Sequence, residues 1–349
     1  MEGQKEIKMD WFIYREFPID LQKEWDELLD ESITQVPFLR FEYMKIWWLN
    51  RGGGEWKDAK LALTVARRDS RLVGIAPLFI SKDRTGNPVL MLLGSIEISD
   101  YLDLIVRPLD LEVFIEGLLD FIHQPDFPIW RSLEWDNILE PSPTLEVFRQ
   151  SAEKKGHSVE VTHLQHAPYI PLPGDFDEYL AGIDKKQRHE IRRKMRRAEE
   201  SENKVDWYES RDAGLLDKDI EKFLELMKFD PQKKGFLSKE MEDQFRQTIR
   251  WAFKADILHL VFLEIDGEKA AGHFSFDYQG RLWAYNSGFS PKYNDLSPGW
   301  VLLGLELRWA NERGYQEYDF MRGNEEYKYR FGALDRNIVR LTMAKKSTI

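Results

Sequence analysis

The sequence predicts an α+β protein made of two tandem units, each a mixed central sheet flanked by helices. Three observations support this fold class. The chain has 349 residues, 42% of them hydrophobic, which exceeds the size of one typical core and is enough to fill two. The same order of elements occurs twice. Short segments also match between the halves, LVGIAPLF with AAGHFSF and LEWDNI with EYDFMRG. We therefore place one unit at residues 1–168 and the other at 169–349.

In the first half, apolar residues at helical spacing predict helices over residues 21–30 and 41–48, followed by the loop RGGGEW. Alternating apolar residues then predict two strands, AKLALTVARR and RLVGIAPLFIS, which turn at Asp69-Ser70. The remaining predicted elements of this half are, in order, the strand VLMLLG, the segment ISDYLDLIV, a helix over 111–124, the strand SLEWDNI, a helix over 143–155 and a strand over 157–163.

The second half opens with a basic helix and then repeats this order. Helices over 218–228 and 239–253 precede a hairpin over 257–278, which turns at Asp266-Gly267, a strong signal for a tight turn. His273 alternates with phenylalanines in this hairpin, so we interpret it as a packed histidine rather than a base. The remaining predicted elements are the strand RLWAYNSGF, the helix WVLLGLELRWANERG and the strand YQEYDFM.

The composition excludes several classes of protein. The chain has no cysteine, which excludes disulfides, thiolate catalysis and thiolate metal ligands. No apolar run approaches the roughly 20 residues of a membrane-spanning helix, and the N-terminus lacks the apolar core of a signal peptide, so we expect a cytoplasmic protein. His157, His163 and His166 lack a carboxylate at ligand spacing, so no metal is expected. RGGGEW lacks the Lys-Ser/Thr of a phosphate loop.

The basic helix is unusual in a chain whose net charge is −11, because residues 184–197 carry eight Lys or Arg against two acids. Such an array fits a phosphate-bearing partner, whether coenzyme A, a lipid-linked or nucleotide-linked sugar, a tRNA end or an anionic bilayer surface. A solvated helix neutralised by acidic neighbours is the alternative. The apolar stripe that must pack inwards is Ile191, Met195 and Ala198. The arginines that we assign to substrate binding are Arg188, Arg192 and Arg196.

The segment DLSPGWVLLGLEL predicts a helix with an anion site at its start. Ser297 is the expected N-cap, Pro298 fits the first helical position and Gly299 lets a ligand approach the backbone. Exposed N–H groups and the helix dipole suit a pyrophosphate or terminal phosphate, with Lys292 just before the helix. An ordinary capped helix is the alternative. Further on, RGNEEYKYRFG begins where a strand ends, and open sheets tend to bind ligands at that end of a strand.

These motifs resemble those of the Fem-like and CelD-like acetyltransferases, which carry two units of the GNAT acyltransferase fold in one chain. The resemblance covers nearly the whole chain and rests on the basic helix, YNDLSPGWVLLGLELRWANERG, YDFMRGNEEYKYRFG and the SDYLD of residues 99–103. It implies that splayed central strands receive an acyl donor. One departure is that PKYNDLSPGW replaces the usual Gln/Arg-x-x-Gly-x-Gly/Ala loop of coenzyme A binders. Both acyl-CoA and aminoacyl-tRNA therefore remain open as donors.

The resemblance also implies roles for single residues. Lys328 matches the Lys of the family's Tyr-Lys pair and would neutralise a phosphate or polarise the reacting carbonyl. Glu325 matches an acidic position and would take the amine's proton, provided that burial raises its pKa. Alternation along RLWAYNSGF puts Tyr285 and Ser287 on one face and Asn286 on the other, so Tyr285 or Asn286 lines the cleft. The other residues that we assign to substrate binding are Asp100, Tyr101, Asp319, Arg322 and Tyr327.

We therefore expect an N-acyltransferase that uses acyl-CoA, such as acetyl-CoA, as co-substrate and needs no metal. The expected acceptor is an amino group of a sugar or of a cell-envelope or polysaccharide precursor, small or linked to a lipid or nucleotide. The acidic chain, and the lack of the long helical hairpin of Fem-type tRNA users, disfavour nucleic acid except as a tRNA donor. Two alternatives stay open: aminoacyl-tRNA-dependent peptidyl transfer and a non-catalytic module for an anionic ligand.

Overall fold

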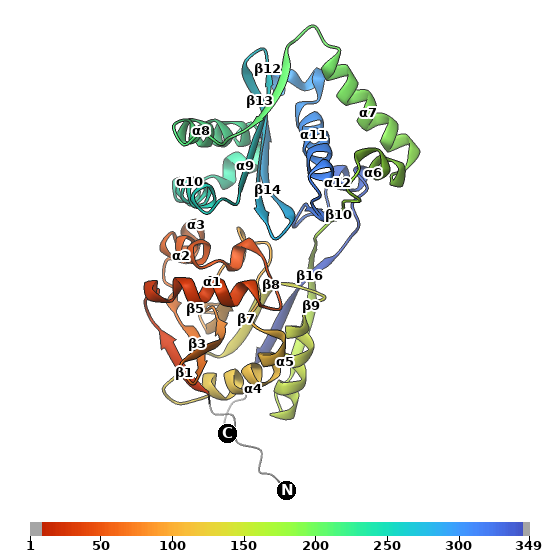
Figure 1. The fold of residues 1–349 in the computed structure, drawn as a ribbon. Coiled ribbons are helices and arrows are strands. Elements are labelled where there is room, and N and C mark those ends of the chain that lie inside the picture. Colours follow the sequence, from red (N-terminus) through yellow and green to blue (C-terminus); the bar gives the residue numbers. More distant parts are fainter. Residues whose placement is uncertain (1–8, 345–349) are drawn as a thin grey trace. The chain divides into compact units, whose positions relative to one another are not determined.

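The computed structural model describes residues 9–344, and Figure 1 shows its elements. The chain divides into two compact units. The first unit comprises the described residues up to Leu164 together with those from Asn337, and the second unit comprises Gln165–Arg336. The first boundary lies close to the expected one, whereas residues 337–344, expected in the second unit, belong to the first. In the described part of the chain, no helix is long and apolar enough to cross a membrane.

The first unit contains two sheets, with strand orders β1-β3-β4-β7 and β2-β5-β6-β8-β16-β9. Its strands are β1 (Asp10–Tyr14), β2 (Lys60–Leu61), β3 (Leu63–Arg68), β4 (Arg71–Ala76), β5 (Leu78–Lys82), β6 (Pro88–Leu92), β7 (Ile105–Val106), β8 (Ser132–Leu139), β9 (Val159–His166) and β16 (Asn337–Ala344). Its helices are α1 (Gln22–Asp30), α2 (Phe41–Leu49), α3 (Arg51–Gly54), α4 (Leu111–Ile122) and α5 (Pro143–Lys154), with short 3-10 turns at Ile19–Leu21, Pro37–Leu39 and Pro108–Asp110.

The run RLVGIAPLFIS, expected as one strand, forms β4 and β5 in two different sheets. The break falls at Pro77, which has no N–H to donate to a ladder. The turn before this run is confirmed, because Asp69 and Ser70 both adopt positive φ, 48° and 67°. The run AKLALTVARR, also expected as one strand, divides at Ala62 into β2 and β3 of the same two sheets, so both strands cross between the sheets and Pro77 accounts for one of the two breaks.

Strand β16 completes the second of these sheets. It pairs antiparallel with β8, from Ile338 opposite Leu139 to Ala344 opposite Ser132, and β9 lies on its other side. Its apolar side chains are buried in this unit. The local pattern of apolar residues does not predict that residues 337–344 pair with β8, which is distant in the sequence.

The second unit has one six-stranded sheet in the order β10-β15-β14-β13-β12-β11. Its strands are β10 (Tyr169–Pro171), β11 (Val205–Glu209), β12 (Leu258–Ile265), β13 (Glu268–Tyr278), β14 (Arg281–Phe289) and β15 (Glu317–Asp319). Its helices are α6 (Phe176–Gly182), α7 (Lys185–Glu199), α8 (Leu216–Met227), α9 (Pro231–Phe236), α10 (Lys239–Lys254), α11 (Pro298–Glu312) and α12 (Glu326–Arg330), and a 3-10 segment, η4 (Pro291–Leu296), precedes α11.

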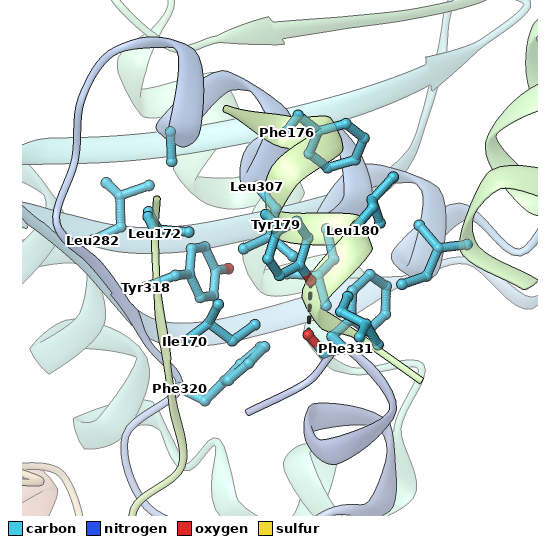
Figure 2. Packing of buried hydrophobic residues seen from close by; sticks show 14 of the residues in the cluster. Ile170, Leu172, Phe176, Tyr179, Leu180, Leu282, Leu307, Tyr318, Phe320 and Phe331 are labelled. Carbon is cyan, nitrogen blue, oxygen red and sulfur yellow. Dashed lines mark hydrogen bonds between the residues drawn. The ribbon is translucent and has the colours of Figure 1, made fainter. Parts of the chain in front are cut away.

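Helices α8, α9 and α10 cover one face of this sheet, and α11, with α6 and α7 outside it, covers the other (Figure 1). Figure 2 shows the core on the α11 side, where Tyr179 of α6 and Phe331, which follows α12, belong to the same cluster as Tyr318 of β15. The hydroxyl of Tyr179 donates to the carbonyl of Phe331 at 2.7 Å, which ties α6 to the end of α12. The hairpin predicted over residues 257–278 is confirmed as β12 and β13, and the helix predicted at WVLLGLELRWANERG is confirmed as α11.

Strands β14 and β15 separate after a short parallel ladder. They pair only from Arg281 opposite Glu317 to Trp283 opposite Asp319, although β14 continues to Phe289. A bulge on β14 shifts its register with β13 and leaves Tyr285 as the extra residue. The bulge breaks the expected alternation. Asn286 is the cross-strand partner of Phe274, so the two side chains lie on the same face of the sheet, the one that α8 and α10 cover. The Tyr285 ring also packs against Phe274, so Tyr285 and Asn286 lie on this same face.

Candidate active site

Beyond Trp283, one edge of β14 has no strand partner among the described residues, and we call residues 284–289 the open edge. Residues 284–287 are partly exposed between buried neighbours. The N–H of Ser290 donates to the carbonyl of Ala270 at 2.8 Å. Because hydrogen-bonded and non-hydrogen-bonded pairs alternate in an antiparallel ladder, the N–H and C=O of Ser287 point away from β13, into the opening.

Side chains satisfy the Ser287 peptide groups at this open edge. The N–H of Ser287 donates to Asn286 Oδ1 at 2.9 Å, and its carbonyl accepts from Lys233 Nζ at 2.6 Å. Lys233 lies on α9, whose first N–H groups are capped by Asp230. Burial of the Lys233 ammonium lowers its pKa. Reading the sequence missed Lys233, because the only local signal, a capped turn with two lysines, does not show that the chain folds back onto β14.

Lys328 organises the loop between β15 and α12. Its side chain is 3% exposed, and its ammonium donates to the carbonyls of Arg322 at 2.7 Å, Gly323 at 3.0 Å and Phe320 at 3.3 Å. It also lies 2.9 Å from Glu325 Oε2. The side chain of Glu325 is 59% exposed, so the burial on which its predicted role as a base depended is not present.

The first turn of α11 lies beside α7 and the end of α12. Ser297 stands at the N-cap position and Pro298 begins the helix, as predicted, but Ser297 adopts a left-handed conformation, φ 52°, and its side chain makes no capping hydrogen bond. The Trp300 ring lies 4.6 Å from the Phe331 ring and 4.0 Å beneath Lys194 Nζ. Trp300 Nε1 is buried and has no hydrogen-bond partner among the described residues. The structure thus brings the start of α11 and the Lys328 segment together.

Residues 185–329 match the family model of an acetyltransferase (GNAT) domain. No curated protein matches the sequence. The crystal structure of FemX superposes with a TM-score of 0.63 at 13% identity, over 91% of this chain and 95% of that chain. A conserved protein of unknown function from Bacteroides thetaiotaomicron VPI-5482 gives a TM-score of 0.60 at 11% identity over 96% and 100%. L-PGS from Bacillus licheniformis gives 0.54 at 12% identity over 93% and 91%.

Residues 185–329 are therefore similar to a GNAT acetyltransferase domain, and the whole chain shares the fold of FemX. In the second unit, the basic helix α7 is partly neutralised by its own surroundings. The apolar stripe predicted to pack inwards is buried. Arg188 donates to the carbonyls of Leu180 at 3.4 Å and Ala181 at 3.1 Å, and Arg192 pairs with Asp177 at 2.8 Å. In the described part of the chain, Arg196 and Arg197 have neither an ion pair nor a side-chain hydrogen bond. Lys194 reaches the start of α11.

The other predicted site residues of this unit are held by neighbours. Lys292 is paired with Glu268 at 2.7 Å, on the surface. Asp319 is fully buried and accepts from Arg336 at 2.6 Å. Tyr327 is 40% exposed, and partial desolvation of its hydroxyl raises the pKa of the phenol, which stays protonated. Tyr327, Arg322 and Asp319 share the β15 to α12 segment with Lys328.

In the first unit, the SDYLD segment forms part of the core. Tyr101 is fully buried and Asp100 is 9% exposed. Asp103 accepts hydrogen bonds of 2.6 Å from Thr34, Ser142 and Thr144. Burial raises the pKa of the Asp103 carboxyl despite these donors. The predicted substrate role of Asp100 and Tyr101 remains a proposal, and the hydrogen bonds of this segment join it to Thr34, to the start of α5 and to β8.

Proposed function

We propose that the protein is a cytoplasmic N-acyltransferase that moves an acyl group from acyl-CoA to an amino group of an amino sugar or another cell-envelope or polysaccharide precursor. The observation that carries the proposal is the open edge of β14, which lies in the unit whose residues 185–329 match an acetyltransferase domain model. Acyl transfer needs a carbonyl held beside polar groups, and an extended ligand can add to an unpaired strand edge.

Three parts of the chain fit an acyl-CoA donor. The first turn of α11 offers backbone N–H groups for phosphates, and Lys194 lies beside it. Trp300 Nε1, which has no hydrogen-bond partner among the described residues, is a further donor there. At the open edge, the Ser287 carbonyl keeps a second lone pair beside its contact with Lys233, so it can accept from an amide of the donor's arm. The Lys233 ammonium has further protons to donate to the acyl carbonyl, and the NH2 group of Asn286, whose Oδ1 accepts from Ser287, is a second donor at the bulge. When bound, acyl-CoA supplies an activated carbonyl and a thiol leaving group.

Hydrogen bonds within the protein hold the residues around this opening. Lys328 anchors the loop that follows β15 through three carbonyls, so Tyr327 and Glu325 start from set positions. Preorganisation of this kind lowers the barrier because polar groups need not reorient during the reaction. The proposal gives Lys328 the role of anchoring this loop, and its role at the reacting carbonyl stays a prediction from the sequence.

Calorimetric titration with acetyl-CoA, palmitoyl-CoA and an aminoacyl-tRNA, each alone, tests which donor binds. Turnover is then measured with glucosamine as the probe acceptor and a thiol reagent that detects released coenzyme A. Because the chain has no cysteine, the protein contributes no background. Binding of acetyl-CoA with thiol release supports the proposal. Binding without release on any amine favours the non-catalytic module, and no binding of either CoA ester overturns acyl-CoA as donor.

Aminoacyl-tRNA is the second candidate donor. The exposed Arg196 and Arg197 favour it, because free guanidinium groups on one helix suit a nucleic-acid backbone. The Arg196→Glu and Arg197→Glu double variant separates the donors. It should weaken binding of an aminoacyl-tRNA strongly, whereas acetyl-CoA held at α11 should bind unchanged.

A further inference from the structure

A buried carboxylate lies beneath the open edge of β14. Glu306, in the middle of α11, is fully buried. One carboxylate oxygen, Oε2, is hydrogen-bonded to Nδ1 of His273 on β13 and accepts from the Tyr318 hydroxyl on β15 at 3.5 Å. The other oxygen lies 3.6 Å from His259 Nε2 on β12. Burial of a charged carboxylate costs free energy unless the carboxylate is paired, so the position of Glu306 against the sheet requires a reason.

The group lies directly under the open edge. Because β13 and β15 flank β14 in the sheet and Glu306 contacts a residue of each, its carboxylate lies under β14. His273 is the cross-strand neighbour of Ser287, and Ala284 packs toward the α11 side. Both β14 residues are small, so they leave room for the imidazole between the sheet and the helix.

Only His273 of this group reaches solvent. Its side chain is 12% exposed, whereas those of Glu306 and His259 are 0% and 1% exposed. Glu306 holds Nδ1, which fixes the tautomer with its proton on that nitrogen. Among the described residues, none forms a hydrogen bond with His273 Nε2, so this lone pair is available. A buried carboxylate that orients an imidazole with a free nitrogen is the arrangement of a general base.

We propose that His273 is the general base of the acyl transfer and that Glu306 is its positioning residue. The assignment rests on the proposed function. Nε2 takes a proton from the acceptor ammonium, and the free amine attacks the thioester carbonyl. The C–N bond forms, the C–S bond breaks, and the sulfur leaves as a thiolate. The second amine proton is transferred to the thiolate, so the products are an amide, a thiol and one proton on His273, which passes to solvent.

The neighbouring groups leave this role to His273. Glu325 is exposed and paired with Lys328, and Lys233 is bonded to the Ser287 carbonyl. His259 is closed off by Trp309, whose ring stacks on it at 4.6 Å. The titratable groups that face the His273 to Glu306 pair are therefore Tyr318 from β15 and His259 from β12. Burial raises the pKa of Tyr318 well above its usual range, so the phenol remains a neutral donor.

Comparison of two acceptors tests the assignment in the His273→Gln variant. Glucosamine is protonated near neutral pH and needs a base, whereas hydroxylamine is not protonated and needs none. We expect the variant to lose about 10²- to 10⁴-fold in kcat with glucosamine, the usual contribution of a general base, and to keep hydroxylamine turnover and acetyl-CoA affinity. Added imidazole should restore part of the glucosamine rate in His273→Ala. Glu306→Gln should lower kcat for glucosamine without changing the affinity for acetyl-CoA.

His166→Gln is the matched control, because His166 pairs with Asp335 at 2.5 Å in the same unit but on the surface. Unchanged glucosamine turnover in His273→Gln overturns the assignment, and so does an equal loss with both acceptors or a loss of acetyl-CoA binding. If the variants fail to fold, carbethoxylation of wild-type His273, followed by mass spectrometry, replaces them. Full glucosamine turnover in the modified protein would overturn the assignment. If the wild type binds no donor, the proposed function fails first, and this assignment fails with it.

Discussion

Lys328 donates its ammonium protons to three backbone carbonyls, and its removal leaves these oxygens without a donor in a buried site. An unsatisfied buried polar group costs about 1 to 3 kcal/mol. Lys328→Met should therefore lower the free energy of unfolding by about 3 kcal/mol, as measured by urea denaturation, and should lower turnover through the displaced loop. Lys292→Met removes a surface pair and should change stability by less than about 0.5 kcal/mol.

Loss of turnover in Lys328→Met without loss of stability would contradict this structural role and would place the ammonium at the reacting carbonyl. The sequence motif alone does not distinguish the two roles. It predicts a lysine after a strand, but it does not predict which backbone carbonyls point at the ammonium. The structure shows the oxygens around it.

Lys233 predicts a pH dependence of stability. Burial lowers its pKa in the folded protein, so in the alkaline range the folded state releases this proton before the unfolded state does. The unfolded state then binds more protons, and stability rises with pH up to the ordinary lysine pKa of about 10.4. We expect the difference in unfolding free energy between wild type and Lys233→Met to increase from pH 8 to pH 10.5. A difference that stays flat or falls with pH would contradict the buried position.

At the scale of elements, the start of α11 is the part that binds phosphate in the proposal. A Cβ at Gly299 would make only ordinary contact with Phe289, at 3.4 Å. Gly299→Asp should leave the fold intact or stabilise it by about 0.3 to 1 kcal/mol through the helix dipole, while its charge repels phosphate. Acetyl-CoA affinity, measured by calorimetry, should fall at least tenfold, or about 1.4 kcal/mol. Gly299→Ala is the control and should keep affinity. If Gly299→Asp and Gly299→Ala bind acetyl-CoA with equal affinity, the donor's phosphates do not bind at the start of α11.

The contact between α8 and β14 tests the packing around the open edge. A Cβ at Gly288 would lie 2.4 Å from the backbone nitrogen of Met227 and 2.5 Å from the carbonyl carbon of Leu226. Backbone atoms of a packed helix do not move aside cheaply, so Gly288→Ala should destabilise the protein by about 3 kcal/mol, at the upper end of overpacking costs. Gly182→Ala in α6 meets open space and should be neutral or slightly stabilising. Thermal unfolding of the two variants compares them directly.

Local elements could be predicted from the sequence because their signals are local. Apolar spacing indicated α7 and the hairpin of β12 and β13, and its turn at Asp266-Gly267 is confirmed. The bulge at Tyr285 and the left-handed Ser297 could not be predicted, because both depend on what neighbouring strands and helices impose. His273 and Glu306 are far apart in sequence, and each is ordinary in its own element. Only the packing of α11 under the sheet pairs them.

For the whole molecule, the second unit is an insertion within the first. The chain leaves the first unit near Leu164 and returns at Asn337. The two crossing segments run side by side, because the N–H of Ala167 donates to the carbonyl of Arg336 at 2.7 Å and that of Tyr169 to Leu334 at 2.9 Å. An inserted unit with adjacent ends has its own core and is expected to fold as a separate fragment.

A chain truncated after Arg336 tests this organisation. It lacks β16, which has β8 on one side and β9 on the other, so both ladders lose their partner and the buried side chains of β16 are missing. We expect the first unit to unfold and become sensitive to trypsin, whereas residues 165–336 keep one cooperative unfolding transition and their acetyl-CoA affinity. No other strand of the sheet can take the place of β16 between β8 and β9. If both units stay folded in the truncated chain, β16 is not needed for the stability of the first unit, and this prediction is wrong.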